Sequence, residues 1–152
     1  MVRRKFSRRE FWNDVRQHQV AVAQYVGEIC RFLLSAPEAP DDKAHSLRKM
    51  AGTGLSPEVW QQWVARFGEA QIFEGWGSTE SNTSTLNLEN RVGSCGRVPF
   101  WEKTNLRLVR YDVGTDSHPR DANGFMQLAA IDEPGEAIGQ IYAYPDIMAG
   151  RF

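Results

Sequence analysis

The sequence has few residues that could form covalent or metal cross-links. It contains two cysteines, Cys30 and Cys95, and three histidines, His18, His45 and His118. The cysteines lie far apart with no second thiol beside either of them, and the histidines show no ligand spacing with each other or with the cysteines. This pattern is typical of free thiols in a reducing compartment and argues against a disulfide framework or a zinc site.

Long apolar runs and an excess of one charge are also missing. No stretch approaches the roughly 20 apolar residues that span a bilayer, and no apolar run follows the basic start MVRRKFSRRE, as a signal peptide would require. The formal net charge is −1, which does not call for nucleic acid or an anionic membrane as a partner. The N-terminal arginines could touch acidic lipid, but a solvated helix start explains them better.

The composition, 41% hydrophobic and 24% charged, permits one domain with a real core. Ser7-Arg8-Arg9-Glu10 has the form of a capping box, with Ser7 as N-cap, and predicts a helix that ends near His18. A short strand is expected at residues 20–22. A second amphipathic helix is expected from apolar residues at helical spacing, which are Tyr25, Ile29, Phe32 and Leu33.

Residues 47–74 predict a strand, a glycine loop, a helix and a second strand. The first strand is expected at 47–51 and is closed by Gly52-Thr53-Gly54. Ser56 and Pro57 are suited to start a helix, and Gly68 to stop it. The buried stripe of this helix would be Val59, Trp60, Trp63 and Phe67, and the next strand is expected at 71–74.

Such a βαβ unit has parallel strands with a right-handed connection. Ligands bind at the carboxyl ends of the strands in parallel sheets. The loop at residues 52–54 follows the first strand, and the segment at residues 75–81 follows the second. The two glycine-containing segments are therefore expected at the same edge of the sheet, where they would form one site.

The second half of the chain has a different pattern. Residues 104–112 alternate between apolar and polar side chains, residues 121–124 form a turn signal, and residues 125–129 and 137–142 suggest further strands. The expected fold class is α/β: a partial βαβ parallel sheet with flanking helices, followed by a mainly antiparallel β segment or small barrel. The expected division is 1–82 for the α/β part and 83–152 for the β part.

The segment FEGWGSTES at residues 73–81 combines groups that suit a nucleotide. The indole of Trp76 could stack on a planar base, and the glycines on either side would let a ligand approach the backbone. The Thr79 hydroxyl could donate to a phosphate, and the Glu80 carboxylate could hold Mg²⁺. On residue chemistry alone a structural explanation stays open, with Ser78 or Thr79 as a cap and Trp76 in the core.

Residues 76–80, Trp-Gly-Ser-Thr-Glu, resemble the adenylate-forming (AMP-binding) superfamily, which has an aromatic residue, a small residue, any residue and then Thr-Glu at its adenine site. The branch most similar is that of the fatty-acid transport proteins and very-long-chain acyl-CoA synthetases. The resemblance covers most of the chain. Its segments are FSRREFWNDVRQHQVAVAQYVGEICRFLLS, RKMAGTGLSPEVWQQWVARFG, VGSCGRV, RYDVGTDSHPRDANGF, GEAIGQI and the terminal GRF.

The resemblance implies a role for each matching position. The adenine pocket would be formed by Gly52, Thr53 and Gly54 through their backbones, by Glu74 near the adenine amino group, by Trp76 stacked on the base, and by Gly77. Tryptophan in place of the more common tyrosine at position 76 is a mild departure.

The resemblance also assigns the reacting end of the nucleotide and the acyl side. Thr79 would contact the α-phosphate of ATP, and Glu80 would bind Mg²⁺. The acyl tunnel would pass near Tyr25, Val26 and Gly27.

The implied reaction has two steps. A fatty carboxylate attacks the α-phosphorus of ATP to give an acyl-adenylate and pyrophosphate, and the thiol of coenzyme A then displaces AMP to give a thioester. The implied substrates are a fatty acid, ATP with Mg²⁺, and coenzyme A. No nucleophilic side chain is required, which agrees with the lack of a Ser-His-Asp or Cys-His arrangement.

The family also uses a Ser/Thr/Gly-rich phosphate loop, a ribose-binding aspartate and a C-terminal lysine, and none of these matches a segment of this sequence. We therefore expect a central fragment of a larger N-terminal adenylation domain that does not complete adenylation alone. The alternative is a non-catalytic remnant that binds a nucleotide or an acyl chain. The expected location is cytoplasmic, and the sequence leaves open whether the parent enzyme associates peripherally with a membrane.

Overall fold

The computed structural model of the chain describes residues 2–98, 100 and 103–141. The chain divides into two compact units: the first comprises Met1–Trp76 and Thr85–Arg97, and the second comprises Gly77–Ser84 and Val98–Phe152. The division into 1–82 and 83–152, as parts of one larger domain, stays a prediction. No helix in the described part of the chain is long and apolar enough to cross a membrane.

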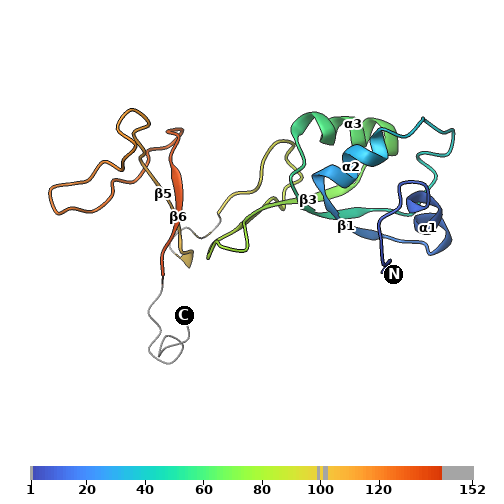
Figure 1. The fold of residues 1–152 in the computed structure, drawn as a ribbon, viewed down its shortest axis with the longest axis horizontal. Helices are drawn as coiled ribbons and strands as arrows, with labels where there is room; N and C mark the ends of the chain where they lie inside the picture. The colour runs from blue at the N-terminus through green and yellow to red at the C-terminus, as the bar shows by residue number, and fades with distance from the viewer. Residues whose placement is uncertain (1, 99, 101–102, 142–152) are drawn as a thin grey trace, which may run out of the picture. The chain divides into compact units, whose positions relative to one another are not determined.

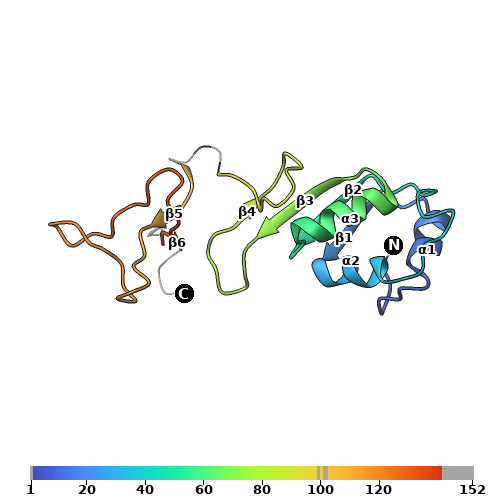
Figure 2. The same ribbon diagram turned by 90° about the horizontal axis from the view of Figure 1, so that it is seen from above.

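The first unit contains a sheet with the strand order β1-β2-β3-β4. Strands β1 (Val22–Val26), β2 (Lys49–Thr53) and β3 (Gln71–Trp76) are parallel, and the short β4 (Thr85–Leu86) runs antiparallel to β3. Helices α2 (Gly27–Leu34) and α3 (Pro57–Phe67) lie side by side over one face of this sheet (Figures 1 and 2). The predicted α/β class and its parallel βαβ unit are confirmed.

Helix α3 begins and ends where the sequence predicts. The Ser56 Oγ accepts a hydrogen bond from the Val59 N–H at 3.3 Å, and Pro57 occupies the first turn. Gly68, with φ of 94°, ends the helix. The predicted apolar stripe of α3 is buried and packs with residues from the strands and α2. The largest fully buried side chains of this core include Trp60, Trp63, Phe67, Leu33, Met50 and Ile72.

The predicted start of the first helix is wrong. Helix α1 (Phe11–Gln17) has Glu10 as its N-cap, with no side-chain capping bond. Ser7 contributes its carbonyl oxygen, which accepts from the Phe11 N–H at 3.0 Å, so residues 7–10 form a turn before the helix. The predicted end near His18 is confirmed.

The second helix and the strands also differ from the prediction in their bounds. Tyr25 belongs to β1, and α2 begins at Gly27 without a linker. The helical spacing of Tyr25 with later apolar residues is thus a coincidence, and Phe32 is 47% exposed. Strand β2 includes Gly52 and Thr53, so only Gly54 of the predicted glycine loop lies beyond the strand. Strand β3 continues to Trp76.

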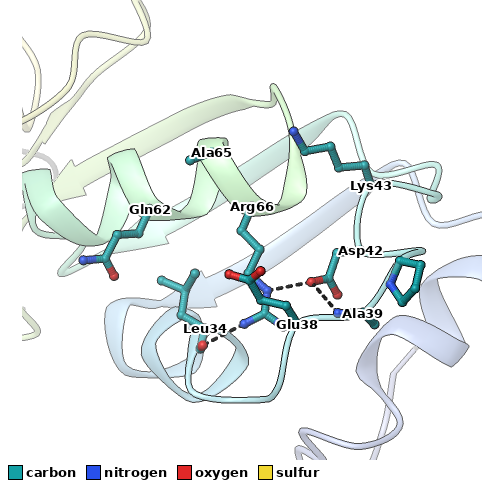
Figure 3. A pocket seen from close by; sticks show the side chains of 9 residues that line it. Leu34, Glu38, Ala39, Asp42, Lys43, Gln62, Ala65 and Arg66 are labelled. Carbon is teal, nitrogen blue, oxygen red and sulfur yellow. Dashed lines mark hydrogen bonds and ion pairs between the residues drawn. The ribbon is translucent and has the colours of Figure 1, made fainter.

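An arginine holds the connection between α2 and β2 against α3. The guanidinium of Arg66 donates to Asp42 Oδ2 at 2.7 Å and to the carbonyl oxygens of Leu34, Ala36 and Pro37 at 2.7–2.8 Å. Figure 3 shows the hollow around this guanidinium, with Asp42 and Leu34 on its two sides. Because its donors already have these partners, the hollow is a structural feature and not an anion site.

The second unit contains a two-stranded antiparallel sheet of β5 (Leu106–Val109) and β6 (Glu136–Gly139). The predicted turn at 121–124 is present, with the Gly124 N–H donating to the Asp121 carbonyl at 3.0 Å. The predicted strand at 125–129 forms only isolated bridges, Arg120 with Met126 and Val109 with Leu128. Antiparallel pairing is confirmed, as an open ladder among the described residues; residue 142 of the last predicted strand lies outside them.

Candidate nucleotide site

Predicted site residues meet at the carboxyl ends of three parallel strands in the first unit. In the strand register, Val26 of β1 is opposite Thr53 of β2, and Thr53 is opposite Gly75 of β3. The Thr53 hydroxyl also donates to the Gly75 carbonyl oxygen at 2.8 Å. This edge therefore brings together the turn after β2, residues 75 and 76 of the second glycine-containing segment, and the end of β1, as expected for an edge that binds a ligand in a parallel sheet. Residues 77–81 of that segment belong to the second unit.

Two glycines at this edge allow the backbones of β1 and β2 to pack directly. A Cβ on Gly27 would overlap the carbonyl oxygen of Gly54, and a Cβ on Gly52 would overlap the carbonyl group of Tyr25. Gly54 has φ of 85°, which favours glycine. The glycines predicted as ligand contacts thus also have a packing role, because no side chain fits between these turns.

Glu74 connects the three strand ends. It lies on β3 and is only 6% exposed. Its Oε1 accepts from the Gly54 N–H at 2.7 Å and the Leu55 N–H at 3.1 Å, and its Oε2 accepts from the Tyr25 hydroxyl. A buried carboxylate requires such partners. The family resemblance implies that Glu74 contacts the adenine amino group, whereas both of its oxygens have partners within the protein.

Burial changes the proton affinity of two groups near Glu74. Burial raises the pKa of Tyr25 well above its ordinary value, and the hydrogen bond to Glu74 raises it further. Burial also raises the pKa of the Cys30 thiol to about 12, with the charge of Glu74 adding to the effect. At neutral pH, Tyr25 therefore remains a donor to Glu74 and Cys30 remains a thiol.

The turn after β2 differs from turns that bind phosphate. Phosphate-binding turns and helix starts use free backbone N–H groups. Here the N–H groups of Gly54 and Leu55 point at the carboxylate of Glu74. A nucleotide at this turn would not be held through these two amides, which favours contact with a base over contact with a phosphate.

Trp76 ends β3 with an accessible indole. It is 41% exposed, whereas Trp60 and Trp63 of α3 are each 1% exposed. The structural explanation that places Trp76 in the core is therefore wrong. Because side chains alternate along a strand, Trp76 and Glu74 belong to the same face of β3. An exposed indole at this edge of the sheet is suited to stack on a planar ring.

The remaining predicted nucleotide residues, Gly77, Thr79 and Glu80, fall in the second unit and are exposed. Ser78 does not cap a helix; its Oγ accepts from the Ser81 N–H at 3.1 Å within a turn. Glu80 forms no hydrogen bond or ion pair with other described residues, and no cluster of three or more potential metal ligands occurs among them. An exposed carboxylate beside a hydroxyl fits Mg²⁺, which usually takes one or two carboxylates with water and phosphate oxygens.

The acyl-side residues differ in what they offer a ligand. Tyr25 is buried with its hydroxyl on Glu74, and Gly27 is buried against Gly54. Val26 is half exposed. Only Val26 among the three therefore presents a side chain to a ligand at this edge.

Asn87 is a site-supporting residue that the sequence did not indicate. It is buried, and its N–H donates to the Glu74 carbonyl oxygen at 2.8 Å. Its side-chain amide donates to the carbonyl oxygens of Arg91 and Ser94 at 2.7 and 2.9 Å. Asn87 thus organises the loop after β4 against the end of β3. A lone asparagine in a polar loop gives no sequence signal for this role.

Comparisons with known proteins identify the family of the chain. The model of the family described as AMP-binding enzyme matches residues 1–126. Human long-chain fatty acid transport protein 1 is 40% identical over 144 residues, which cover 93% of this chain and 22% of the relative. Human long-chain fatty acid transport protein 3 is 37% identical over 143 residues, covering 93% of this chain and 21% of the relative.

A solved structure shares the fold. ATP-bound MatB from Rhodopseudomonas palustris has a TM-score of 0.56 at 22% sequence identity, over 76% of this chain and 23% of that chain. The chain spans about a fifth of the length of the curated relatives that it matches. With the family match over most of the sequence, the chain belongs to the AMP-binding enzyme family.

Proposed function

We propose that this chain forms the adenine side of the active site of a fatty-acid acyl-CoA synthetase. The observation that carries the proposal is the exposed indole of Trp76 at the end of β3, next to the glycine turn of β2. The family and the fatty acid transport protein relatives support a long-chain fatty acid as substrate. The reaction would be ATP-dependent formation of an acyl-adenylate, followed by transfer of the acyl group to coenzyme A.

Each residue has a defined part in this proposal. Trp76 stacks on the adenine, and the backbone at Gly52–Gly54 lines the edge of the base. The Thr79 hydroxyl donates to the α-phosphate, which gains negative charge as the fatty carboxylate attacks. The Glu80 carboxylate holds Mg²⁺, which when bound neutralises charge between the two anionic reactants.

The acyl side is proposed at the end of β1. Val26 offers an exposed apolar side chain there, and apolar surface is what a fatty chain would cover. We keep a cytoplasmic location, with peripheral membrane association of the parent enzyme, as part of the proposal. A fatty acid in solution or at a membrane surface would serve equally as the substrate.

Calorimetric titration of the purified chain with ATP and Mg²⁺ tests the nucleotide site. Removing a stacked aromatic costs about 1–3 kcal/mol per base in nucleic-acid complexes, so Trp76→Ala should weaken binding by roughly fivefold to a hundredfold. Phe32→Ala is the matched control, since Phe32 is exposed to a similar degree on α2. A folded chain that binds no nucleotide, or equal binding by Trp76→Ala, would contradict the proposal.

A second function is favoured by the location of the residues. The base-side residues other than Gly77 are together in the first unit, whereas Gly77, Thr79 and Glu80 belong to the second. The chain could therefore bind a nucleotide or an acyl chain without catalysis. An assay for acyl-CoA formation separates the two functions: we expect nucleotide binding without acyl-CoA production from this chain alone, and turnover would assign it the full activity.

A further inference from the structure

We propose that Glu74 is a positioning residue for the nucleotide, which fixes the turn at Gly54 and Leu55 beside the indole of Trp76, and that Tyr25 holds Glu74 in place. This inference rests on the proposed function, because it concerns the same edge of the sheet. It assigns to Glu74 a task within the protein in place of direct contact with the base.

The contacts of the carboxylate carry the first step. Two consecutive N–H groups of the turn converge on Oε1, at 2.7 and 3.1 Å, while the Tyr25 hydroxyl donates to Oε2. Hydrogen bonds to an ionised acceptor are stronger than neutral ones, and burial strengthens them further. One side chain of β3 therefore fixes both the turn after β2 and the end of β1.

The backbone around the turn makes this fixation relevant to a ligand. Gly54 has a positive φ and packs against Gly27, so the turn has little freedom once the carboxylate is in place. Glu74 and Trp76 are on the same face of β3, two residues apart. A change in the position of the carboxylate would thus move the turn relative to the indole, and a base between them would lose contact area.

The role of Tyr25 is separable from packing. Its ring is buried in the core, and its hydroxyl has Glu74 as its partner. Tyr25→Phe keeps the ring and removes the hydroxyl that orients Oε2. The second unit offers a matched control, because the Tyr111 hydroxyl donates in the same way to a carboxylate, that of Asp116, at an exposed position.

The experiment compares Tyr25→Phe, Glu74→Gln, Glu74→Ala and Tyr111→Phe in the full chain. Calorimetry gives the Kd for ATP and for inosine triphosphate, which has a carbonyl oxygen in place of the adenine amino group. Amide hydrogen exchange at Gly54 and Leu55 reports the turn itself. Each variant is first checked for a cooperative thermal transition, which shows that it is folded. If Glu74→Ala does not fold, the two conservative variants, Tyr25→Phe and Glu74→Gln, test the inference without it.

We expect Tyr25→Phe to raise the Kd by roughly fivefold to tenfold, which is the scale of one typical hydrogen bond within a protein. The factor should be the same for both nucleotides, and exchange at Gly54 and Leu55 should become faster. Glu74→Gln, which keeps an oxygen for the two amides, should retain more affinity than Glu74→Ala. Tyr111→Phe should bind like the wild type.

Two results would overturn the inference while leaving the proposed function intact. One is wild-type affinity and unchanged exchange of the two amides in Tyr25→Phe. The other is a loss confined to ATP in the Glu74 variants, which would make Glu74 a direct contact of the adenine amino group. If the folded wild-type chain binds neither nucleotide, the proposed function fails, and this inference fails with it.

Discussion

The indole of Trp12 stacks on the imidazole of His45, with ring centroids 4.5 Å apart and planes 16° from parallel. The His45 Nδ1 accepts from the Leu47 N–H at 3.2 Å, so the proton of the neutral ring is assigned to Nε2, which donates to the Phe67 carbonyl oxygen at 2.9 Å. Protonation of Nδ1 would break the bond to Leu47. The arrangement therefore holds His45 neutral between α1, the start of β2 and the end of α3.

This arrangement predicts a loss of stability in mild acid. Burial lowers the pKa of His45, and the positive charges of Arg16 and Arg48 lower it further. The hydrogen bond to the Phe67 carbonyl oxygen raises the pKa but does not outweigh these effects. The unfolded chain then binds a proton more readily than the folded one, so stability is complete above about pH 6.5, the ordinary value, and declines as the pH falls below it. Urea unfolding at pH 7.5 and pH 5.5 measures the effect.

The control separates His45 from other titrating groups. His45→Gln should remove most of the pH dependence between these two values, whereas His18→Gln, at an exposed position, should keep it. A wild-type free energy of unfolding that is equal at both pH values would contradict this prediction.

The Arg66–Asp42 pair should matter more than an exposed pair. Their side chains are 10% and 11% exposed, and Arg66 also binds three carbonyl oxygens. Lysine has no planar fork to reproduce this set, so Arg66→Lys should lower the free energy of unfolding by on the order of 2–3 kcal/mol. Arg97→Lys, in an exposed pair with Glu89, should change it by less than about 0.5 kcal/mol.

The same pair predicts a second loss of stability at lower pH. Burial opposes ionisation of Asp42, but hydrogen bonds from Arg66 and from the Ala39 N–H outweigh it, and the pKa of Asp42 lies below its ordinary value. The stability from this carboxylate is therefore complete above about pH 4, its ordinary value, and is lost as the pH falls through the lower, folded value. Asp42→Asn should flatten the unfolding curve below about pH 4; an unchanged slope would argue against it.

Two glycines on the neighbouring strands β2 and β3 should respond differently to a methyl group. A Cβ on Gly52 would overlap the backbone of Tyr25, whereas a Cβ on Gly75 would lie 3.4–3.5 Å from its neighbours, an ordinary contact. Gly52→Ala should therefore destabilise the chain by about 3 kcal/mol or more, and Gly75→Ala by about 1 kcal/mol or less. Thermal unfolding of the two variants tests the difference, and similar midpoints would show that the strands adjust.

The cysteines should differ in reactivity. Cys95 is exposed, whereas Cys30 is fully buried with a pKa raised to about 12. Because the thiolate is the reactive form, a thiol reagent at pH 8 should label one site quickly, and Cys95→Ser should abolish the fast phase. Unfolding in urea should make both thiols reactive. Fast labelling of Cys95→Ser in the native state would mean that α2 opens readily.

Several local signals predict the fold correctly, although the capping box at residues 7–10 does not. Ser56, Pro57 and Gly68 mark the ends of α3. The order of strand, glycine loop, helix and strand at residues 47–74 predicts the parallel sheet. The spacing of apolar residues predicts the wrong element for Tyr25, because β1 passes directly into α2 and a strand residue continues the helical spacing. The partners of Glu74 were not predictable, since they depend on the register of three strands and on the backbone of Gly54. The same holds for Asn87, whose partners are the carbonyl oxygen of Glu74 on β3 and backbone atoms of its own loop.

Each of the two units is built from two separate segments of the chain, which affects how a protease could divide them. The polypeptide leaves the first unit after Trp76, returns at Thr85 and leaves again after Arg97. No single proteolytic cut can therefore release either unit as one contiguous peptide. A nick anywhere between Gly77 and Ser84 would leave β3 and β4 on different peptides, held together only by noncovalent contacts such as the β3–β4 pairing and the hydrogen bond from the Ile72 N–H to Asn90.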